Sequence, residues 1–140
     1  MPPKSALFIS KEWCNQIFDG NKTWELRSFP MPEHRKRKPT AIAMSKCNRL
    51  VGEVTFDKCL RVGRRRDDTG KWEPVTQSEK YKNNFFLAPR NEVKCGFNKT
   101  NVPRVISKYR EIYAWKMSNI RKYVSIIVVI ICCSNGKIRN

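Results

Sequence analysis

Three charged side chains lie close together in the segment Gly20–Arg27, which reads GNKTWELR. Lys22 follows a turn and could reach a phosphate as a compact positive charge. Glu25 could accept a hydrogen bond from a base amino group, and Arg27 could grip a phosphate or a base edge with its planar fork. Glu25 and Arg27 are two residues apart on an extended segment, so they share a face and can pair with each other. The structural alternative is a sheet-stabilising ion pair worth up to about 1 kcal/mol.

Aromatic residues in and beyond this segment could stack on bases. Trp24, Tyr113 and Trp115 carry flat rings, and each stacked base is worth about 1–3 kcal/mol. Trp24 alternates with Leu26, which favours packing in the core. For Trp115 both interpretations stay open. Trp13 shares a helical face with an apolar residue four positions later, so we expect it in the core.

The charge distribution points to a polyanionic partner. The chain has 140 residues, with 29 Lys or Arg and 12 Asp or Glu, and a net charge of +17. Residues 34–66 hold eleven basic and two acidic side chains, and residues 103–140 hold eight and one. Such clustering favours phosphate-backbone contacts, so nucleic acid is the first expected partner and an anionic membrane surface the second. The densest runs, each of which could instead be a solvated loop, are Arg35, Lys36, Arg37, Lys38 and Arg64, Arg65, Arg66.

Length and residue types exclude several classes of protein. The chain is the size of one domain, which excludes a multidomain enzyme, and its 11% aromatic content argues against disorder. The single histidine, His34, lies in a basic loop, which argues against a Ser-His-Asp mechanism. The six cysteines form no C-x-x-C pair, so we expect no metal and no cofactor. No secretory signal is visible and the apolar run 126–133 is too short to span a bilayer, so we expect reduced thiols in the cytoplasm or nucleus.

Hydrophobic periodicity predicts the elements that position these residues. Residues 11–18 form an expected two-turn helix, with Ser10 as N-cap and Gly20 as its left-handed stop. Strands are expected over residues 8–9, 22–29, 40–44, 50–62, 109–117 and 125–132. Within the fourth of these, the residues expected to share one face are Val54, Phe56, Leu60 and Val62.

The remaining segments read as connections. Loops are expected over 30–39 and 63–71, a short helix from Thr76 to Lys82, and a long polar loop over 83–103 that covers a binding face. Ser118 is expected to cap a turn that ends at Tyr123. Five or six short strands with two or three short helices in a single domain, residues 1–140, predict an α+β fold built on a closed or nearly closed β-barrel.

Several of these segments resemble the ASCH domain, a PUA-like β-barrel. Gly20–Arg27 is similar to the G-x-K-T-x-E-x-R signature of that family. Weaker similarities follow in the family's order, at residues 41–45, 51–54, 76–81 and 113–115. The resemblance covers residues 6 to about 124. Residues 125–140 depart from the family pattern and leave the C-terminal wall of any pocket in doubt.

The resemblance implies a basic cleft beside the signature strand that receives RNA, a single nucleotide or a nucleoside. RNA is the first expected ligand, and a protein partner is a further possibility. Besides the two basic runs, the residues expected to bind nucleic acid are Lys22, Trp24, Glu25, Arg27, Ser45, Tyr113 and Trp115.

Two other functions stay open. Some small ASCH proteins hydrolyse the amide of N4-acetylcytidine with a lysine, a hydroxyl residue and a glutamate; Lys22 matches the lysine, but Glu25 stands where the hydroxyl residue belongs. Other relatives resemble ribonucleases that use lysine, arginine and tyrosine. The candidate catalytic residues are therefore Lys22, Glu25 and Tyr113. The second alternative is a transcription-coactivator-type interaction domain, which an exposed apolar edge at 126–131 would favour.

Overall fold

The computed structural model describes residues 3–47, 49–75, 95, 108–128, 131–132 and 137–138. In chain order the elements are β1 (Ala6–Ile9), α1 (Lys11–Phe18), β2 (Trp24–Arg27), a 3-10 turn η1 (Glu33–Arg35), β3 (Pro39–Met44), β4 (Arg49–Arg65), β5 (Trp72–Pro74), β6 (Glu111–Val128), β7 (Ile131–Cys132) and β8 (Lys137–Ile138).

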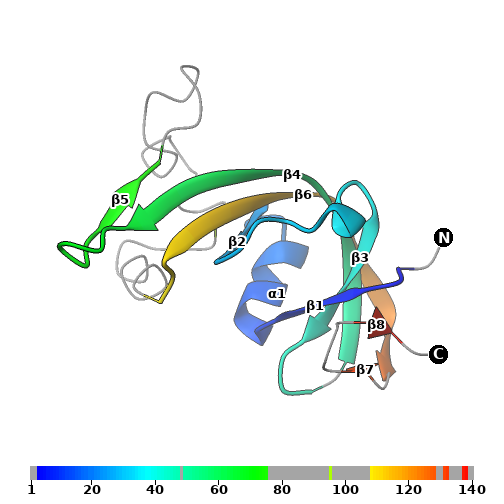
Figure 1. Ribbon diagram of the computed structural model, residues 1–140. Helices are drawn as coiled ribbons and strands as arrows, with labels where there is room; N and C mark the ends of the chain where they lie inside the picture. The colour runs from blue at the N-terminus through cyan, green and yellow to red at the C-terminus, as the bar shows by residue number, and fades with distance from the viewer. Residues whose placement is uncertain are drawn as a thin grey trace.

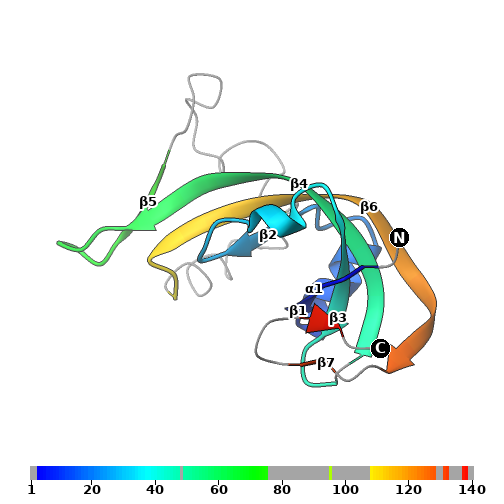
Figure 2. The same ribbon diagram turned by 45° about the vertical axis from the view of Figure 1, so that its right-hand side comes forward.

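A bent sheet carries the fold. Its strand order is β1-β3-β4-β6-β2, and β5 pairs with β4 beside this path. β1 and β3 are parallel, whereas the other pairs are antiparallel. β4 and β6 form a long ribbon that arches over α1, with β1 and β3 toward one end and β5 at the other (Figures 1 and 2). β7 and β8 form a separate two-stranded sheet.

The sheet is open, so the expectation of a closed or nearly closed barrel is wrong. β1 and β2 are its two edge strands, and they do not pair with each other. The chain passes from β1 to β2 through α1, which packs against β3 and β6 within the arch. A side chain bridges the opening instead of a strand ladder: Nη2 of Arg27 donates to the carbonyl oxygen of Phe8 at 2.9 Å.

The expected helix over residues 11–18 is confirmed. Ser10 is its N-cap, although the Ser10 side chain makes no capping hydrogen bond. Gly20 adopts a φ of +79°, as a left-handed stop requires. Within the described part of the chain there is one α-helix and one 3-10 turn, fewer than the two or three helices expected. The expected helix at 76–82 and the loop at 83–103 lie outside the described residues, apart from Cys95.

Two strands are much longer than their sequence pattern predicts. β4 has 17 residues and continues through Arg65 into the expected loop, and β6 has 18 residues. The expected turn from Ser118 to Tyr123 is therefore wrong. Asn119 takes a left-handed φ of +46° inside β6, and register shifts against β4 absorb the irregularity without breaking the pairing. Pairing with a long partner overrides the local turn signal here.

A β-bulge divides the apolar residues of β4 between two cores. The register with β6 shifts between Phe56 and Lys58. Val54 and Phe56 consequently pack in the core that α1 covers, whereas Leu60 and Val62 pack on the opposite face. The expectation that these four residues share one face is wrong, because one extra residue reverses the alternation of side chains beyond it.

Gly52 allows β4 to cross closely over the end of α1. A Cβ atom at this position would lie 2.4 Å from the ring of Phe18 and 2.5 Å from the backbone oxygen of Arg121. The second contact is with backbone, so a rotamer change cannot relieve it. A glycine at this point in β4 is thus a packing requirement of the arch.

We expect Gly52→Ala to destabilise the protein by about 1–3 kcal/mol, because overpacking forces the backbone to shift. Urea denaturation followed by circular dichroism measures this. Asn15→Ala, on the exposed face of α1, is the control and should leave stability within about 0.5 kcal/mol. Equal midpoints for the two variants would contradict the close approach.

The described cysteines differ in burial, and we therefore expect them to differ in reactivity. Cys14, Cys47, Cys59 and Cys95 are free thiols, and Cys47 is exposed. Burial raises the pKa of Cys14 to about 11, with a smaller contribution from Glu25. Burial likewise raises the pKa of Cys95 to about 12.

Because the thiolate is the reactive form, we expect iodoacetamide near neutral pH to modify Cys47 and to spare Cys14 and Cys95 in the native protein. Peptide mass spectrometry resolves the sites, and labelling in denaturant is the control in which all of them react. Native labelling of Cys14 at the rate of Cys47 would refute the buried environment.

Candidate nucleic-acid interface

The signature segment folds as a turn followed by the edge strand β2. Trp24 pairs with Lys116 and Arg27 with Tyr113 in the antiparallel ladder with β6. The expected alternation is present: Trp24 and Leu26 pack in one core, and Glu25 lies opposite Trp115 on the other face. Trp24, Glu25 and Leu26 are nevertheless all buried, since both faces of the sheet are covered here.

Lys22 is a buried, fully bonded ammonium with 3% of its surface exposed. Its Nζ donates to the carbonyl oxygens of Trp24 at 2.7 Å and Cys95 at 2.8 Å, and lies 3.1 Å from Oε2 of Glu25. It also sits 5.4 Å from the ring centroid of Trp13. These three polar partners match the three donors of an ammonium. In this arrangement Lys22 holds the site together and has no donor left for a phosphate.

Glu25 links Lys22 to Arg27. One carboxylate oxygen faces Lys22, and the other lies 3.0 Å from Nη2 of Arg27, which also bonds to the carbonyl of Phe8. The result is a chain of three charges, with a net charge of +1, that runs from the turn before β2 to the far edge of the sheet. Buried charges of this kind require their partners, because an uncompensated one is costly.

A small cavity opens along this chain of charges, between the end of β1, the start of α1 and β2. Its volume is about 180 Å³, and Ser10, Trp13, Lys22, Glu25, Arg27 and Tyr109 are among the residues that line it. Pockets that enclose a drug-sized ligand measure about 300–1,000 Å³. The cavity is therefore sized for a single ring system with polar edges. It places the Glu25 carboxylate and the Arg27 guanidinium beside aromatic rings.

The aromatic residues that line the cavity are not the ones that the sequence offered as candidates for stacking on bases. Trp115 is fully buried, with ring edges of Phe29 and Phe56 at centroid distances of 5.5 and 5.3 Å. Trp24 is 8% exposed. Neither ring offers a face to a base in this conformation. Trp13 and Tyr109 line the cavity instead.

Tyr113 lies next to Arg27 in the ladder and belongs to another polar group. Its hydroxyl donates to Oε2 of Glu111 at 2.8 Å, and Oε1 of Glu111 accepts from Arg61 at 2.6 Å. The hydrogen bond to Glu111 is the main cause that raises the pKa of Tyr113. Tyr113 and Lys22 therefore have separate sets of partners, and their joint catalytic role stays a prediction.

Ser45 follows β3 and is not among the residues that line either described cavity. Its backbone N–H donates to the carbonyl oxygen of Ile9 at 2.8 Å. The observed role of Ser45 is to extend the pairing of β1 with β3. Its contact with nucleic acid stays a prediction.

The first basic run divides into one buried and three exposed residues. Arg35 is 9% exposed and donates from Nη2 to the carbonyl of Ala6 at 3.1 Å. Burial, and then the charge of Arg27, lower the pKa of Arg35 below its usual value. Lys36, Arg37 and Lys38 are exposed. Arg35 therefore braces β1, while the next three residues remain available to a ligand.

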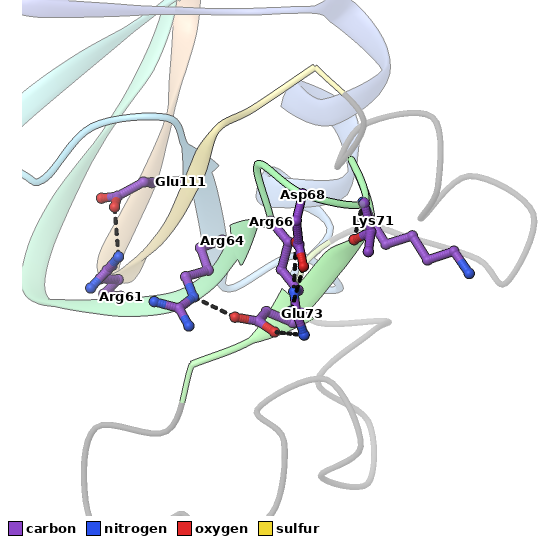
Figure 3. Close-up of polar contacts among 8 residues, drawn as sticks. Arg61, Arg64, Arg66, Asp68, Lys71, Glu73 and Glu111 are labelled. Carbon is purple, nitrogen blue, oxygen red and sulfur yellow. Dashed lines mark hydrogen bonds and ion pairs between the residues drawn. The ribbon is translucent and has the colours of Figure 1, made fainter.

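The second basic run lies at the end of β4, where the chain turns back as β5. Arg64 pairs with Glu73, and Arg66 pairs with Asp68 at 2.6 Å (Figure 3). Arg64, Arg65, Arg66 and Asp68 are among the residues that line a larger cavity of about 540 Å³. The predicted run is thus a folded, ion-paired surface.

The sequence analysis also considered a metal site, a membrane span and an apolar edge at residues 126–131. Among the described residues, no three His, Cys, Asp or Glu side chains gather to hold a metal ion. No helix in the same ranges is long and apolar enough to cross a membrane. The side chains of 126–131, considered above as an apolar edge, lie outside those described.

Three solved structures have a fold similar to that of this chain. The overall fold is similar to the crystal structure of ASCH from Zymomonas mobilis, with a TM-score of 0.58, 11% identity, and coverage of 84% of this chain and 68% of that one. A serine-to-alanine variant of the Z. mobilis protein matches with a TM-score of 0.58, 12% identity, and coverage of 87% and 73%. A tyrosine-to-phenylalanine variant matches with a TM-score of 0.61, 11% identity, and coverage of 90% and 76%.

These likenesses show a common PUA-like fold. No curated protein matches the sequence. The family model of the ASCH domain matches residues 7–126, which include most of β1, the whole signature strand β2 and nearly all of β6. The resemblance carried by Gly20–Arg27 is therefore confirmed, and the chain belongs to the ASCH domain family.

Proposed function

We propose that this ASCH domain binds nucleic acid, with RNA as the first candidate, and that it receives one base in the cavity beside β2. The observation that carries the proposal is the chain formed by the buried Lys22 and Glu25 and the half-buried Arg27, which runs along a cavity of about 180 Å³. A structural ion-pair network needs no adjoining cavity. Here the polar edge of that network faces space of the size of one base.

Glu25 and Arg27 retain hydrogen-bonding capacity that is suited to the edge of a base. A carboxylate has about four lone-pair sites, and Glu25 retains acceptor capacity beyond its contacts with Lys22 and Arg27. Arg27 has five donors, and its Nε is buried without a hydrogen-bond partner in the described part of the chain. Glu25 can therefore accept from an exocyclic amino group, while Arg27 donates to a carbonyl or a phosphate. Lys22 acts as a positioning residue that fixes the Glu25 carboxylate.

The exposed positive charges of the first basic run are suited to the phosphates in the rest of a nucleic-acid strand. Lys36, Arg37 and Lys38 follow Arg35, which is itself anchored to β1. Their positive charges attract phosphates whatever the base sequence. Base recognition would then come from the cavity, and sequence-independent affinity from the surface.

Arg27→Lys is the sharpest test of the cavity, because it keeps the charge and removes the fork. We expect it to weaken binding of single-stranded RNA by about 5-fold to 150-fold, which corresponds to the loss of about 1–3 kcal/mol for a bidentate contact. Fluorescence anisotropy measures the affinity. The matched control is Arg49→Lys, an exposed arginine at the start of β4 that does not line the cavity. Equal affinities for both variants would refute binding at the cavity.

Trp13 supplies a direct optical signal for the same site. A nucleoside bound beside its ring should quench tryptophan emission, and we expect Trp13→Phe to abolish most of that quenching while the protein stays folded by circular dichroism. Trp13 lines the cavity, whereas Trp115 is fully buried. Quenching that survives in Trp13→Phe would place the ligand elsewhere.

The salt dependence of binding tests the exposed run. We expect Lys36→Gln/Lys38→Gln to reduce the log–log salt slope for single-stranded RNA by about 1.4, at about 0.7 for each lost phosphate contact. Lys46→Gln/Lys122→Gln removes the same charge from two exposed positions elsewhere and should change the slope less. If the two pairs shift the slope equally, the binding reflects net charge alone.

A further inference from the structure

We propose that the cavity between the end of β4 and the start of β6 is a second phosphate-binding site, which takes the backbone of a strand whose base occupies the cavity beside β2. We call it the arginine groove. Its volume is about 540 Å³, and its cationic lining consists of Arg61, Arg64, Arg65, Arg66 and Arg110. The assignment of the ligand to a nucleic-acid strand rests on the proposed function.

Two stretches of chain that are far apart in the sequence meet at the arginine groove. Arg61 and Arg64 lie on β4, Arg66 lies in the turn toward β5, and Arg110 immediately precedes β6. The N–H of Arg65 donates to the carbonyl oxygen of Arg110 at 2.8 Å, which fixes the two strands side by side at the groove. Guanidinium groups that converge from separate stretches of chain suit the planar, bidentate recognition of phosphate.

Two of the three carboxylates that line the groove, those of Asp67 and Asp68, are exposed. Arg66 pairs with Asp68 at side-chain exposures of 51% and 59%, and Arg110 pairs with Asp67 at 75% and 80%. Exposed pairs of this kind contribute little to stability, because water and salt screen them. A phosphate can displace Asp67 and Asp68 and form charge-assisted bonds to the same guanidinium groups. The two aspartates then act as resident counterions that an incoming strand replaces.

A more sheltered arginine anchors the inner wall of the groove. Arg61 is held by Oε1 of Glu111, whose other oxygen accepts from Tyr113, and Figure 3 shows the Arg61–Glu111 contact apart from the pairs of Arg64 and Arg66. The Nε of Arg61 is shielded from solvent and has no hydrogen-bond partner among the described residues. Glu111 therefore holds the Arg61 guanidinium in a fixed orientation at the wall of the groove.

The sheet connects the arginine groove to the small cavity. Arg27 pairs with Tyr113 across β2 and β6, and Tyr113 pairs with Arg61 across β6 and β4. Residues that pair directly across antiparallel strands share a face, and neighbouring strands lie about 4.8 Å apart. Arg27 at the cavity and Arg61 at the groove are thus separated by two strand spacings, about 10 Å, on one face. One nucleic-acid strand can contact both.

Removal of the two aspartate carboxylates tests the inference, because it predicts a gain in RNA affinity and not a loss. We expect Asp67→Asn/Asp68→Asn to bind a labelled single-stranded RNA several-fold more tightly than wild type, because no carboxylate has to be displaced. Glu12→Gln/Asp19→Asn removes the same charge from the exposed surface of α1 and its C-cap and should produce a smaller gain. A gain equal to that of the control, or a loss of affinity, would overturn the exchange of carboxylate for phosphate.

The opposite change removes the guanidinium groups. We expect Arg64→Gln/Arg66→Gln to weaken RNA binding and to reduce the salt slope by about 1.4, while nucleoside quenching of Trp13 stays at its wild-type level. If RNA binding is unchanged here but lost in Arg27→Lys, the groove inference fails and the proposed function stands. If Arg27→Lys and Trp13→Phe also have no effect, the proposed function fails. Circular dichroism checks folding, and the aspartate variants test the groove even if the arginine pair unfolds.

Discussion

The buried ammonium of Lys22 is the constraint on which the site and the open sheet both depend. A charge removed from water must find polar partners, and Lys22 finds two backbone carbonyls and the Glu25 carboxylate. Glu25 then holds Arg27, and Arg27 reaches the carbonyl of Phe8 on the opposite edge strand. A single chain of charges therefore fixes the turn before β2, the segment at Cys95 and both edges of the sheet. The small cavity lies along this chain of charges, at the opening where a closed barrel would have a strand ladder.

The second constraint is geometric and lies in β4. Its bulge between Phe56 and Lys58 places Val54 and Phe56 on one side of the sheet and Val62 on the other, so that one long ribbon supports two cores. The ribbon can then continue beyond the domain centre as far as Arg65. That extension carries the second basic run away from α1 and toward the start of β6. The arginine groove lies on this extension, beside the start of β6.

The two cationic places differ in how their charges are compensated. At the cavity, the partners are buried and few, which favours a fixed geometry and selective contacts. At the arginine groove, the ion pairs are exposed, which favours exchange with a ligand. A nucleic-acid strand has bases to be selected and phosphates to be held, and the two environments suit these two tasks. The net charge of +17 favours association with a polyanion in general.

The sequence by itself determined the family signature, the helix with its Gly20 stop, the alternation in β2 and the positions of the basic runs. These features depend on local spacing and on residue type, which a linear pattern records. Only the tertiary structure decided that Lys22 is buried, that Trp13 and Tyr109 line the cavity in place of Trp24 and Trp115, and that Arg110 joins the second basic run. It also decided that the sheet stays open and that β6 runs past Ser118. Those outcomes depend on strand register and on contacts between residues far apart in the chain, where one bulge changes the face of every later side chain.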